Sequence, residues 1–333
     1  MRSNLSFKSN NLKLAGHLYV PDDYKKGEKR PAIVVSHPFG GVKEQTAGLY
    51  AKKLSEKGFI TLAFDASYQG ESEGEPQFLE DPFARVEDIK SAVSFLESRD
   101  EVDHEDIGAL GICASDGMFT YVPFAAQTDL RIKAVATVSG ADMGDLFRKG
   151  LNTSIAPNLD HLLEESNKAR TEEAQGKPPR LEHIVPNTPE EIPKDTPPGG
   201  LYREGTDYYR TPRGQHPNSK NWFLLKSVDQ IVEYSSYDHV DMISPRPLLM
   251  IAGTKADTRF YSEMAIDKAK EPRELFLIDG ATHIALYDKP EYVNPAVEKM
   301  NSFFEHYLQS ANKLPNAENK GYNDNKKAKN AKA

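Results

Sequence analysis

Cysteine is almost absent from this sequence: among 333 residues only Cys113 is present, so an intramolecular disulfide is excluded. The first ten residues are polar and lack the apolar stretch of a secretory signal. A lone cysteine without an export signal is typical of the reducing cytoplasm, which is where we expect the protein. Such a cysteine is a candidate nucleophile, although a single buried cysteine more often serves packing.

Long apolar runs and an excess of positive charge are also missing. Runs such as 31–35 and 248–252 have the length of a strand, far below the roughly 18 apolar residues of a membrane span. The net charge of −8 gives no support for binding to nucleic acid or to an anionic membrane. Because there is no second cysteine and no H-E-x-x-H sequence, we expect no metal and no cofactor. The expected partner is a small molecule, and a homodimer is left open.

Strand-like and helix-like segments alternate through the first 140 residues. Segments 43–57 and 82–98 have apolar residues at helical spacing. The segments between the helices are apolar along their length, which is typical of strands buried on both faces. This alternation predicts an α/β fold with a mostly parallel central sheet flanked by helices. The predicted strands are 32–37, 59–65, 107–113 and 132–139.

The alternation stops at about residue 141 and resumes at 246. The region between is polar, and residues 178–200 alone hold seven prolines, as in irregular loop. We interpret residues 141–245 as an inserted cap or lid, and residues 1–140 and 246–310 as the core. Residues 311–333 are rich in Lys and Asn, with almost no apolar side chains beyond alanine. We expect this tail to be disordered.

The candidate nucleophile lies in a short motif, residues 111–115, which reads Gly-Ile-Cys-Ala-Ser. It follows a predicted strand and precedes a predicted helix, and Cys113 is its third residue. In the G-x-S-x-G elbow, the third residue is the nucleophile. The start of the helix would favour a thiolate there, because its N–H groups and dipole attract negative charge. The alternatives are a buried packing cysteine, or Ser115 as the nucleophile.

A second motif, residues 37–41, also follows a strand and precedes a helix, and reads His-Pro-Phe-Gly-Gly. In hydrolases with such an elbow, this loop supplies one of the two N–H groups that bind an oxyanion. We predict an oxyanion hole formed by the N–H groups of Phe39 and Ala114. The alternative is a simple glycine turn, and we interpret His37 as structural.

Two further residues complete a predicted triad. Asp257 follows the strand-like run 247–252, and His283 follows the run 275–279, which gives the chain order nucleophile, acid, base. His283 would take the proton of Cys113, and Asp257 would fix the imidazole tautomer. Two other carboxylates, Glu263 and Asp279, remain alternatives for the acid.

Four side chains are predicted to line the substrate pocket: Tyr68, Tyr209, Arg210 and Trp222.

The chain resembles a known group of enzymes over roughly residues 5–308. Its motifs are similar to those of bacterial and fungal α/β hydrolases close to the polyketide-transferase group, and more distantly to dienelactone hydrolases, which also have Cys in the elbow. The resemblance implies an α/β-hydrolase fold and hydrolysis or transfer of an acyl group from an ester or thioester. The motifs are 37–46, 64–72, 85–90, 111–115, 209–214, 244–249 and 279–283.

One residue departs from the pattern of that group. The elbow usually reads Cys-Ala-Ser-Gly-Gly, whereas Asp116 stands here in place of the first glycine. A carboxylate suits the start of a helix but disfavours a nearby thiolate. Three functions therefore stay open: a Cys-dependent ester or thioester hydrolase, an acyltransferase with the same triad, and a catalytically silent ligand-binding protein.

The elbow position generates a direct test of the nucleophile. We expect Cys113→Ala to abolish hydrolysis of a short-chain p-nitrophenyl ester while the circular dichroism spectrum stays unchanged. Ser115→Ala should retain measurable activity, because Ser115 falls two residues past the elbow position. An active Cys113→Ala together with an inactive Ser115→Ala would reverse the assignment.

Overall fold

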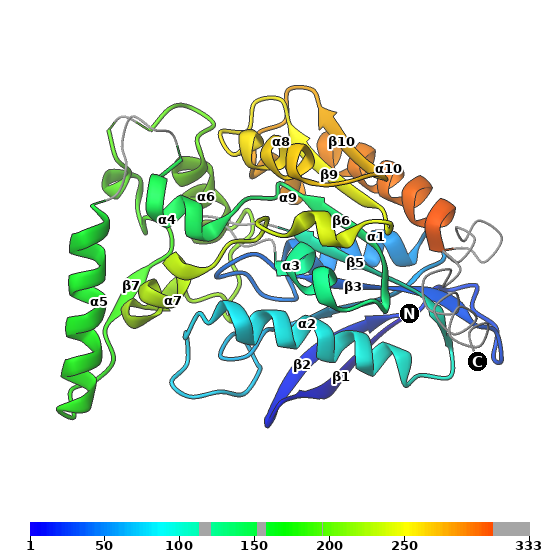
Figure 1. Ribbon diagram of the computed structural model, residues 1–333, viewed down its shortest axis with the longest axis horizontal. Coiled ribbons are helices and arrows are strands. Elements are labelled where there is room, and N and C mark those ends of the chain that lie inside the picture. The colour runs from blue at the N-terminus through cyan, green and yellow to red at the C-terminus, as the bar shows by residue number, and fades with distance from the viewer. Residues whose placement is uncertain (113–120, 152–157, 195, 309–333) are drawn as a thin grey trace, which may run out of the picture.

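The apolar runs of the sequence form the centre of one sheet. The computed structural model describes residues 1–112, 121–151, 158–194 and 196–308, and there the main sheet has eight strands (Figure 1). Six neighbours, in the order β4-β3-β5-β6-β9-β10, pair in parallel, and β1 and β2 are antiparallel at one edge. The predicted mostly parallel sheet is confirmed. The strands are β1 (Arg2–Ser9), β2 (Leu12–Tyr19), β3 (Arg30–Ser36), β4 (Ile60–Phe64), β5 (Val102–Ile112), β6 (Ile132–Val138), β9 (Leu248–Gly253) and β10 (Arg273–Ile278).

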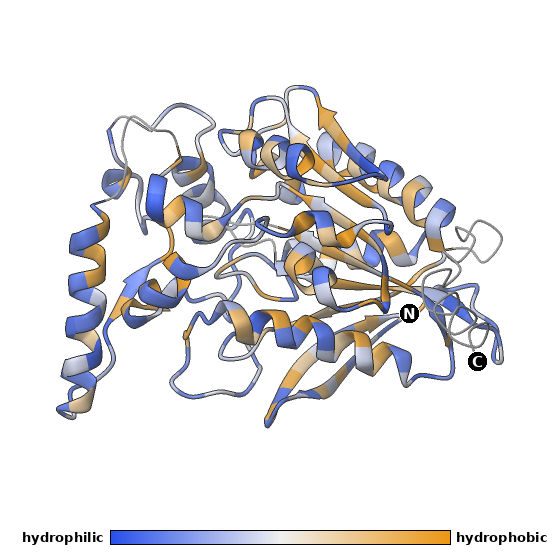
Figure 2. Ribbon diagram, viewed as in Figure 1, coloured by the Kyte–Doolittle hydropathy of each residue, from blue (hydrophilic) through white to orange (hydrophobic). Residues whose placement is uncertain are grey.

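Helices cover both faces of this sheet, so its middle strands are buried. All residues of β4 and β9 are buried, and Figure 2 shows apolar residues gathered along the central strands. Helices α1 and α10 contact each other on one face, and α2 and α3 contact each other on the opposite face (Figure 1). The helices flanking the sheet are α1 (Thr46–Ser55), α2 (Pro82–Glu97), α3 (Tyr121–Thr128), α8 (Arg259–Lys268), α9 (Ala285–Asp288) and α10 (Pro290–Leu308).

Helix α2 illustrates how local sequence sets an element. Its N-cap residue Asp81 accepts hydrogen bonds from the N–H groups of Phe83 and Ala84, at 2.9 and 3.1 Å. Pro82 occupies the first turn, where its missing N–H is not needed. The apolar residues buried by the helix recur at three- and four-residue intervals, as the sequence predicts: Val86, Ile89, Val93 and Leu96.

The strand order reverses in the middle of the sheet. After β3 the chain crosses to β4 on one side, and β5 returns to pair with β3 on its other side. In open α/β sheets, ligands bind at the carboxyl ends of strands where the order reverses. The loop after β3 and the segment after β5 both begin at this edge, since Ser36 pairs with Gly111.

The chain between β6 and β9 leaves the main sheet, and most of it lies to one side in Figure 1. It includes a separate two-stranded antiparallel sheet of β7 and β8. This is the region for which the sequence predicts a cap. Its elements are α4 (Met143–Lys149), α5 (Leu159–Ala174), β7 (Leu181–His183), η1 (Pro189–Glu191), α6 (Leu201–Arg210), β8 (Trp222–Leu224), η2 (Leu225–Ser227), α7 (Val228–Glu233) and η3 (Val240–Ile243).

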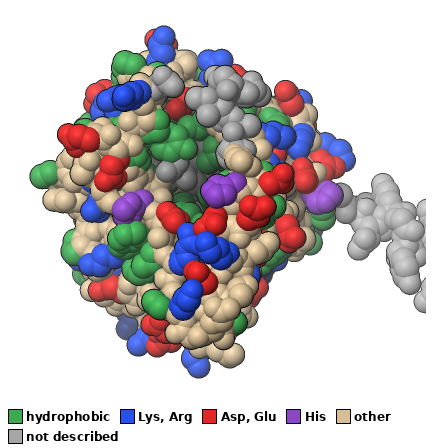
Figure 3. Space-filling model, turned by 90° about the vertical axis from the view of Figure 1, so that its left-hand side faces the viewer, with side chains coloured by type: hydrophobic (Ala, Val, Ile, Leu, Met, Phe, Trp, Pro, Cys, Tyr) green, Lys and Arg blue, Asp and Glu red, His purple; other side chains and the backbone are tan. Residues whose placement is uncertain are grey.

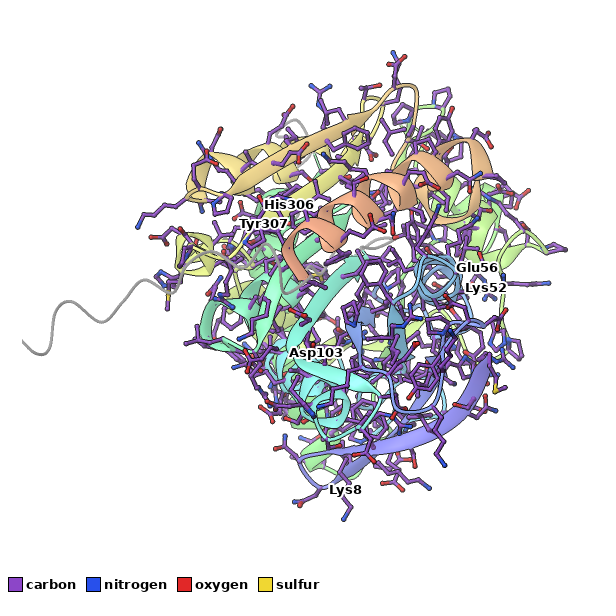
Figure 4. All side chains as sticks on the ribbon, turned by 90° about the vertical axis from the view of Figure 1, so that its right-hand side faces the viewer. Lys8, Lys52, Glu56, Asp103, His306 and Tyr307 are labelled. Atoms are coloured by element: carbon purple, nitrogen blue, oxygen red, sulfur yellow. The ribbon has the colours of Figure 1, made fainter. Side chains whose placement is uncertain are left out.

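The end of the molecule remote from this region carries surface charge. Figure 4 shows Lys52 and Glu56 close together, where they form an ion pair one helical turn apart. At the end of α10, the rings of His306 and Tyr307 meet edge to face, with 4.5 Å between their centroids (Figure 4).

In the described part of the chain, no helix has the length and apolar character needed to cross a membrane.

The Asp81 cap gives a stability prediction. We expect Asp81→Ala to lower the free energy of unfolding by about 0.5–2 kcal/mol, because two N–H groups of α2 lose their acceptor. Urea denaturation measures the change. Glu87→Ala, which removes a carboxylate from the same helix without touching the cap, is the control. Equal destabilisation by the two variants would contradict the capping role.

Candidate active site

His283 lies in the loop after β10, and its side chain is fully buried. Its Nδ1 lies 2.5 Å from the Thr258 hydroxyl, and its Nε2 lies 3.3 Å from the Tyr287 hydroxyl. The His283 carbonyl accepts a hydrogen bond from Ser139, at 3.0 Å, at the end of β6. His283 is therefore held at the carboxyl edge of the sheet, next to the end of β6, and its imidazole lies between two hydroxyl groups.

The structure gives Asp257 a different neighbour from the one that the sequence predicts. Its Oδ2 accepts a hydrogen bond of 2.8 Å from the N–H of Leu201, the first residue of α6, and its Oδ1 is buried without a partner. Asp257 and His283 share no hydrogen bond. Burial raises the pKa of Asp257; the Leu201 N–H opposes the rise, and the Glu204 carboxylate adds to it.

The two alternative acids are also engaged elsewhere. Glu263 pairs with Arg259 on α8, at 2.9 Å. Asp279 accepts a hydrogen bond from the Thr254 hydroxyl, at 3.1 Å. The group against Nδ1 is Thr258, which sequence reasoning missed although it is adjacent to Asp257.

The predicted elbow, with the candidate nucleophile and one predicted oxyanion donor, lies outside the described residues. Its members there are Cys113, Ala114, Ser115 and Asp116. Strand β5 ends at Ile112, immediately before them, and Ile112 pairs with Val138 of β6. These assignments stay predictions.

The loop after β3 has a well-defined geometry. The Pro38 carbonyl accepts hydrogen bonds from the Gly41 N–H, at 2.9 Å, and from Nδ1 of His37, at 2.6 Å. The Pro38–Phe39 peptide is not among the cis bonds of the chain, so the Phe39 N–H points opposite to that carbonyl. The N–H predicted to bind an oxyanion is thus directed away from His37.

His37 itself is neutral and part of a buried network. Its Nε2 accepts from the Ala66 N–H and from the Arg85 guanidinium, both at 3.1 Å, so the proton resides on Nδ1. Arg85 forms an ion pair of 2.8 Å with Glu80, which also accepts from the Tyr121 hydroxyl at 2.6 Å. Burial, and then the charge of Arg85, hold the pKa of His37 well below its usual range. These contacts agree with the structural role expected for His37.

Residues of the segment 141–245, for which the sequence predicts a cap, contact the same loop directly. Ser219 donates a 2.6 Å hydrogen bond to the Gly40 carbonyl, and the Phe223 ring meets the Phe39 ring with centroids 5.5 Å apart. Gly40 has φ +68°, and a Cβ there would lie 2.4 Å from Cδ1 of Ile184. The backbone conformation favours glycine at this position, and a Cβ there would require the Ile184 side chain to shift.

Tyr209, one of the predicted pocket residues, packs near Tyr287, the neighbour of His283. It is buried, and its ring lies 6.5 Å from that of Tyr287, whose hydroxyl faces the imidazole. Trp222 stacks on His183 at 4.1 Å, and Arg210 is exposed at the end of α6. Tyr68 has φ +69° in the loop after β4. Figure 3 views the molecule from the side where most of the chain between β6 and β9 lies, and it shows a hollow there with hydrophobic side chains.

One acidic cluster among the described residues has the spacing of a metal site: Glu44, Asp65 and Glu71. The Lys43 ammonium already lies at its centre, 2.7, 2.7 and 2.6 Å from the three carboxylates respectively. The centre of the cluster is therefore occupied by a cation that the protein itself supplies.

Comparison with known proteins gives matches over most of the chain. The model of the dienelactone hydrolase family matches residues 14–144. YcjY, an uncharacterised protein of Escherichia coli K12, is 38% identical over 92% of this chain and 100% of its own. The crystal structure of the hypothetical protein PA2218 of Pseudomonas aeruginosa has a TM-score of 0.84 and 35% identity, covering 92% of this chain and 94% of that one. The thiohydrolase aneE of Aspergillus aculeatus is 27% identical over 74% of each chain.

The buried, neutral His37 predicts how stability changes with pH. In the unfolded chain its pKa returns to about 6.5, so below that pH the unfolded state takes up a proton that the folded state does not bind. This one group therefore lowers the free energy of unfolding as the pH falls below 6.5, by up to about 1.4 kcal/mol per pH unit.

We expect His37→Asn to flatten the decline in unfolding free energy between about pH 7 and 5, measured by urea denaturation. His104→Asn, which changes a partly exposed histidine on β5, should keep the wild-type slope. An unchanged slope in His37→Asn would show that this residue is not the buried neutral group.

Proposed function

Because the chain belongs to the dienelactone hydrolase-like group of α/β hydrolases, we propose that it cleaves ester or thioester bonds through an acyl-enzyme on Cys113. The observation that carries the proposal is the buried His283, held at the sheet edge where β5 ends and Cys113 follows. A histidine fixed beside an elbow cysteine is the usual means of activating a thiol.

The roles follow from the contacts of the imidazole. Nδ1 lies 2.5 Å from the Thr258 hydroxyl and Nε2 lies 3.3 Å from that of Tyr287, so we assign proton transfer to the more weakly held Nε2. His283 Nε2 takes the proton of Cys113, sulfur bonds to the acyl carbon, and the leaving alcohol or thiol departs with that proton. A water molecule then gives its proton to Nε2 and attacks the thioester, which releases the acid and the free thiol.

The oxyanion of each tetrahedral intermediate needs preorganised donors. We assign these to the N–H groups of Phe39 and Ala114. The geometry that supports Phe39 is the fixed Pro38–Phe39 peptide, whose carbonyl is bound by His37 and Gly41. Such a donor requires no reorganisation when charge develops on the substrate.

The segment 141–245 is proposed to form the cap of the pocket. Its Ser219 and Ile184 contact the loop that carries Phe39, and the Leu201 N–H is bound by Asp257 of the core. The rings of Tyr208 and Tyr209 pack edge to face, 4.9 Å apart, and both approach Tyr287 beside His283. An apolar acyl chain suits such aromatic walls. Tyr68, Arg210 and Trp222 remain predicted pocket residues.

Hydrolysis and acyl transfer differ only in the acceptor, which is water in one case and an alcohol in the other. The resemblance to polyketide transferases favours transfer, whereas aneE is named a thiohydrolase. A small-molecule acyl ester or thioester is the proposed substrate in both cases. The lone thiol is consistent with a reducing compartment, and we propose the cytoplasm.

The test is an activity profile over p-nitrophenyl esters and acyl thioesters of increasing chain length, with and without an added alcohol acceptor. We expect turnover that His283→Ala lowers by about 10³-fold or more. Mass spectrometry of the quenched protein should show an acyl adduct that Cys113→Ala lacks. Binding of these compounds without turnover or adduct would identify a silent ligand-binding protein instead.

A further inference from the structure

Arg213 lies three residues after the end of α6 and has no role in the function proposed above. We propose that it is a positioning residue for His283, because its guanidinium holds both ends of the short helix that follows the histidine. Its effect on catalysis rests on the proposed function, whereas its geometry rests on described contacts.

The guanidinium binds the segment that carries His283 at two points. Its Nε and Nη2 donate to the two carboxylate oxygens of Asp288, at 2.9 and 2.7 Å. Nη2 also donates to the carbonyl of Ile284, the residue after His283, at 3.4 Å. Ile284 is the N-cap of α9, and Asp288 is its last residue. Because a bidentate pair fixes direction as well as distance, one planar group sets the orientation of this helix.

The two carboxylates that bind Arg213 differ in exposure. The side chains of Arg213 and Asp288 are 16% and 26% exposed. Asp207, which accepts from Nη1 at 3.0 Å, is 57% exposed. Exposed ion pairs contribute little, because water and salt screen them. The fork to Asp288 is therefore the contact that matters, and Asp207 offers a matched carboxylate on the same guanidinium.

Aromatic packing connects Arg213 with the imidazole. Its guanidinium carbon lies 5.7 Å from the centre of the Tyr208 ring, which meets the Tyr287 ring edge to face at 5.3 Å. The Tyr287 hydroxyl lies 3.3 Å from Nε2 of His283, and all three rings are buried. A displacement of α9 would therefore move Tyr287 against Nε2, the nitrogen to which proton transfer is assigned.

The residue after Arg213 is fixed to the other predicted part of the site. The Gly214 carbonyl accepts a 2.6 Å hydrogen bond from the side chain of Gln45, the N-cap residue of α1. A Cβ at Gly214 would lie 2.5 Å from the Tyr208 ring, so the backbone packs closely there. Arg213 thus stands between the loop after β3, which carries Phe39, and the segment that carries the histidine.

Loss of the fork should affect turnover more than substrate binding. A misplacement of about 1 Å can cost about 10²-fold in rate, because proton transfer needs Nε2 within hydrogen-bond reach of the attacking sulfur. We expect Arg213→Ala to lower kcat about 10–100-fold, with KM within about threefold of the wild type. Arg213→Lys should lose about tenfold, since an ammonium keeps the charge but cannot bind Asp288 and Ile284 together.

Asp207→Asn is the matched control. It removes the exposed carboxylate from the same guanidinium and should leave kcat within about twofold of the wild type. If Arg213→Ala does not fold, as judged by circular dichroism, Arg213→Lys decides the question. Wild-type kcat in Arg213→Lys, an equal loss in Asp207→Asn, or a loss confined to KM would overturn the proposal.

A second measurement does not depend on turnover. The ring signals of His283 in a proton–nitrogen NMR spectrum are assigned by their disappearance in His283→Ala. We expect Arg213→Lys to shift these signals and Asp207→Asn to keep them; because lysine preserves the charge, the shift reports a change of geometry. Unchanged signals in Arg213→Lys would refute the positioning role. If no substrate or acyl adduct were found while the signals shifted as expected, only the proposed function would fail.

Discussion

A buried ion pair between Arg85 and Glu80 connects the starts of α2 and α3 with the loop after β3. Glu80 lies one residue before the Asp81 cap of α2 and accepts from Tyr121, the first residue of α3. Arg85 reaches from the first turns of α2 to His37, and His37 binds the Pro38 carbonyl. An unpaired charge at such depth would be strongly unfavourable, so each member requires the others. The orientation of the Phe39 peptide thus depends on a chain of buried side chains that reaches from α3 to His37.

The predicted cap contacts the core next to the residues of the predicted site. Ser219 binds Gly40 beside the predicted oxyanion donor, and the Thr282 hydroxyl, adjacent to His283, donates to Glu204 of α6. Asp257 holds the start of that helix. The segment that carries α6 and the loops that carry Phe39 and His283 are therefore connected, and a shift of α6 would reach the surroundings of His283.

Much of the core could be predicted from sequence because the pattern of apolar residues within each short segment already indicates whether the segment is a strand or a helix. The apolar runs around Val34 and Met250 leave no polar face, and only a sheet covered on both sides accommodates them. Helix α2 was predictable from the spacing of its apolar residues. The position of His283 after β10 followed from the order of motifs along the chain.

The partner of the imidazole could not be predicted in the same way. Asp257 and Thr258 are adjacent and equally able to accept a hydrogen bond, and the sequence order favours the carboxylate. What distinguishes them is the N–H of Leu201, which lies 56 positions earlier, within the irregular cap. Tyr287 was also missed, although its spacing of four residues from His283 is that of one helical turn. Contacts set by tertiary packing leave no periodic signal in the sequence.

The contact between Gly40 and Ile184 constrains how this protein can diversify. The space that a side chain at position 40 would need is filled by Ile184. A different residue at position 184 alters the fit against the loop, and a side chain at position 40 would push the Ile184 methyl group aside. Substitutions at the two positions are therefore expected to be coupled, so that a change at one position is best tolerated together with a compensating change at the other.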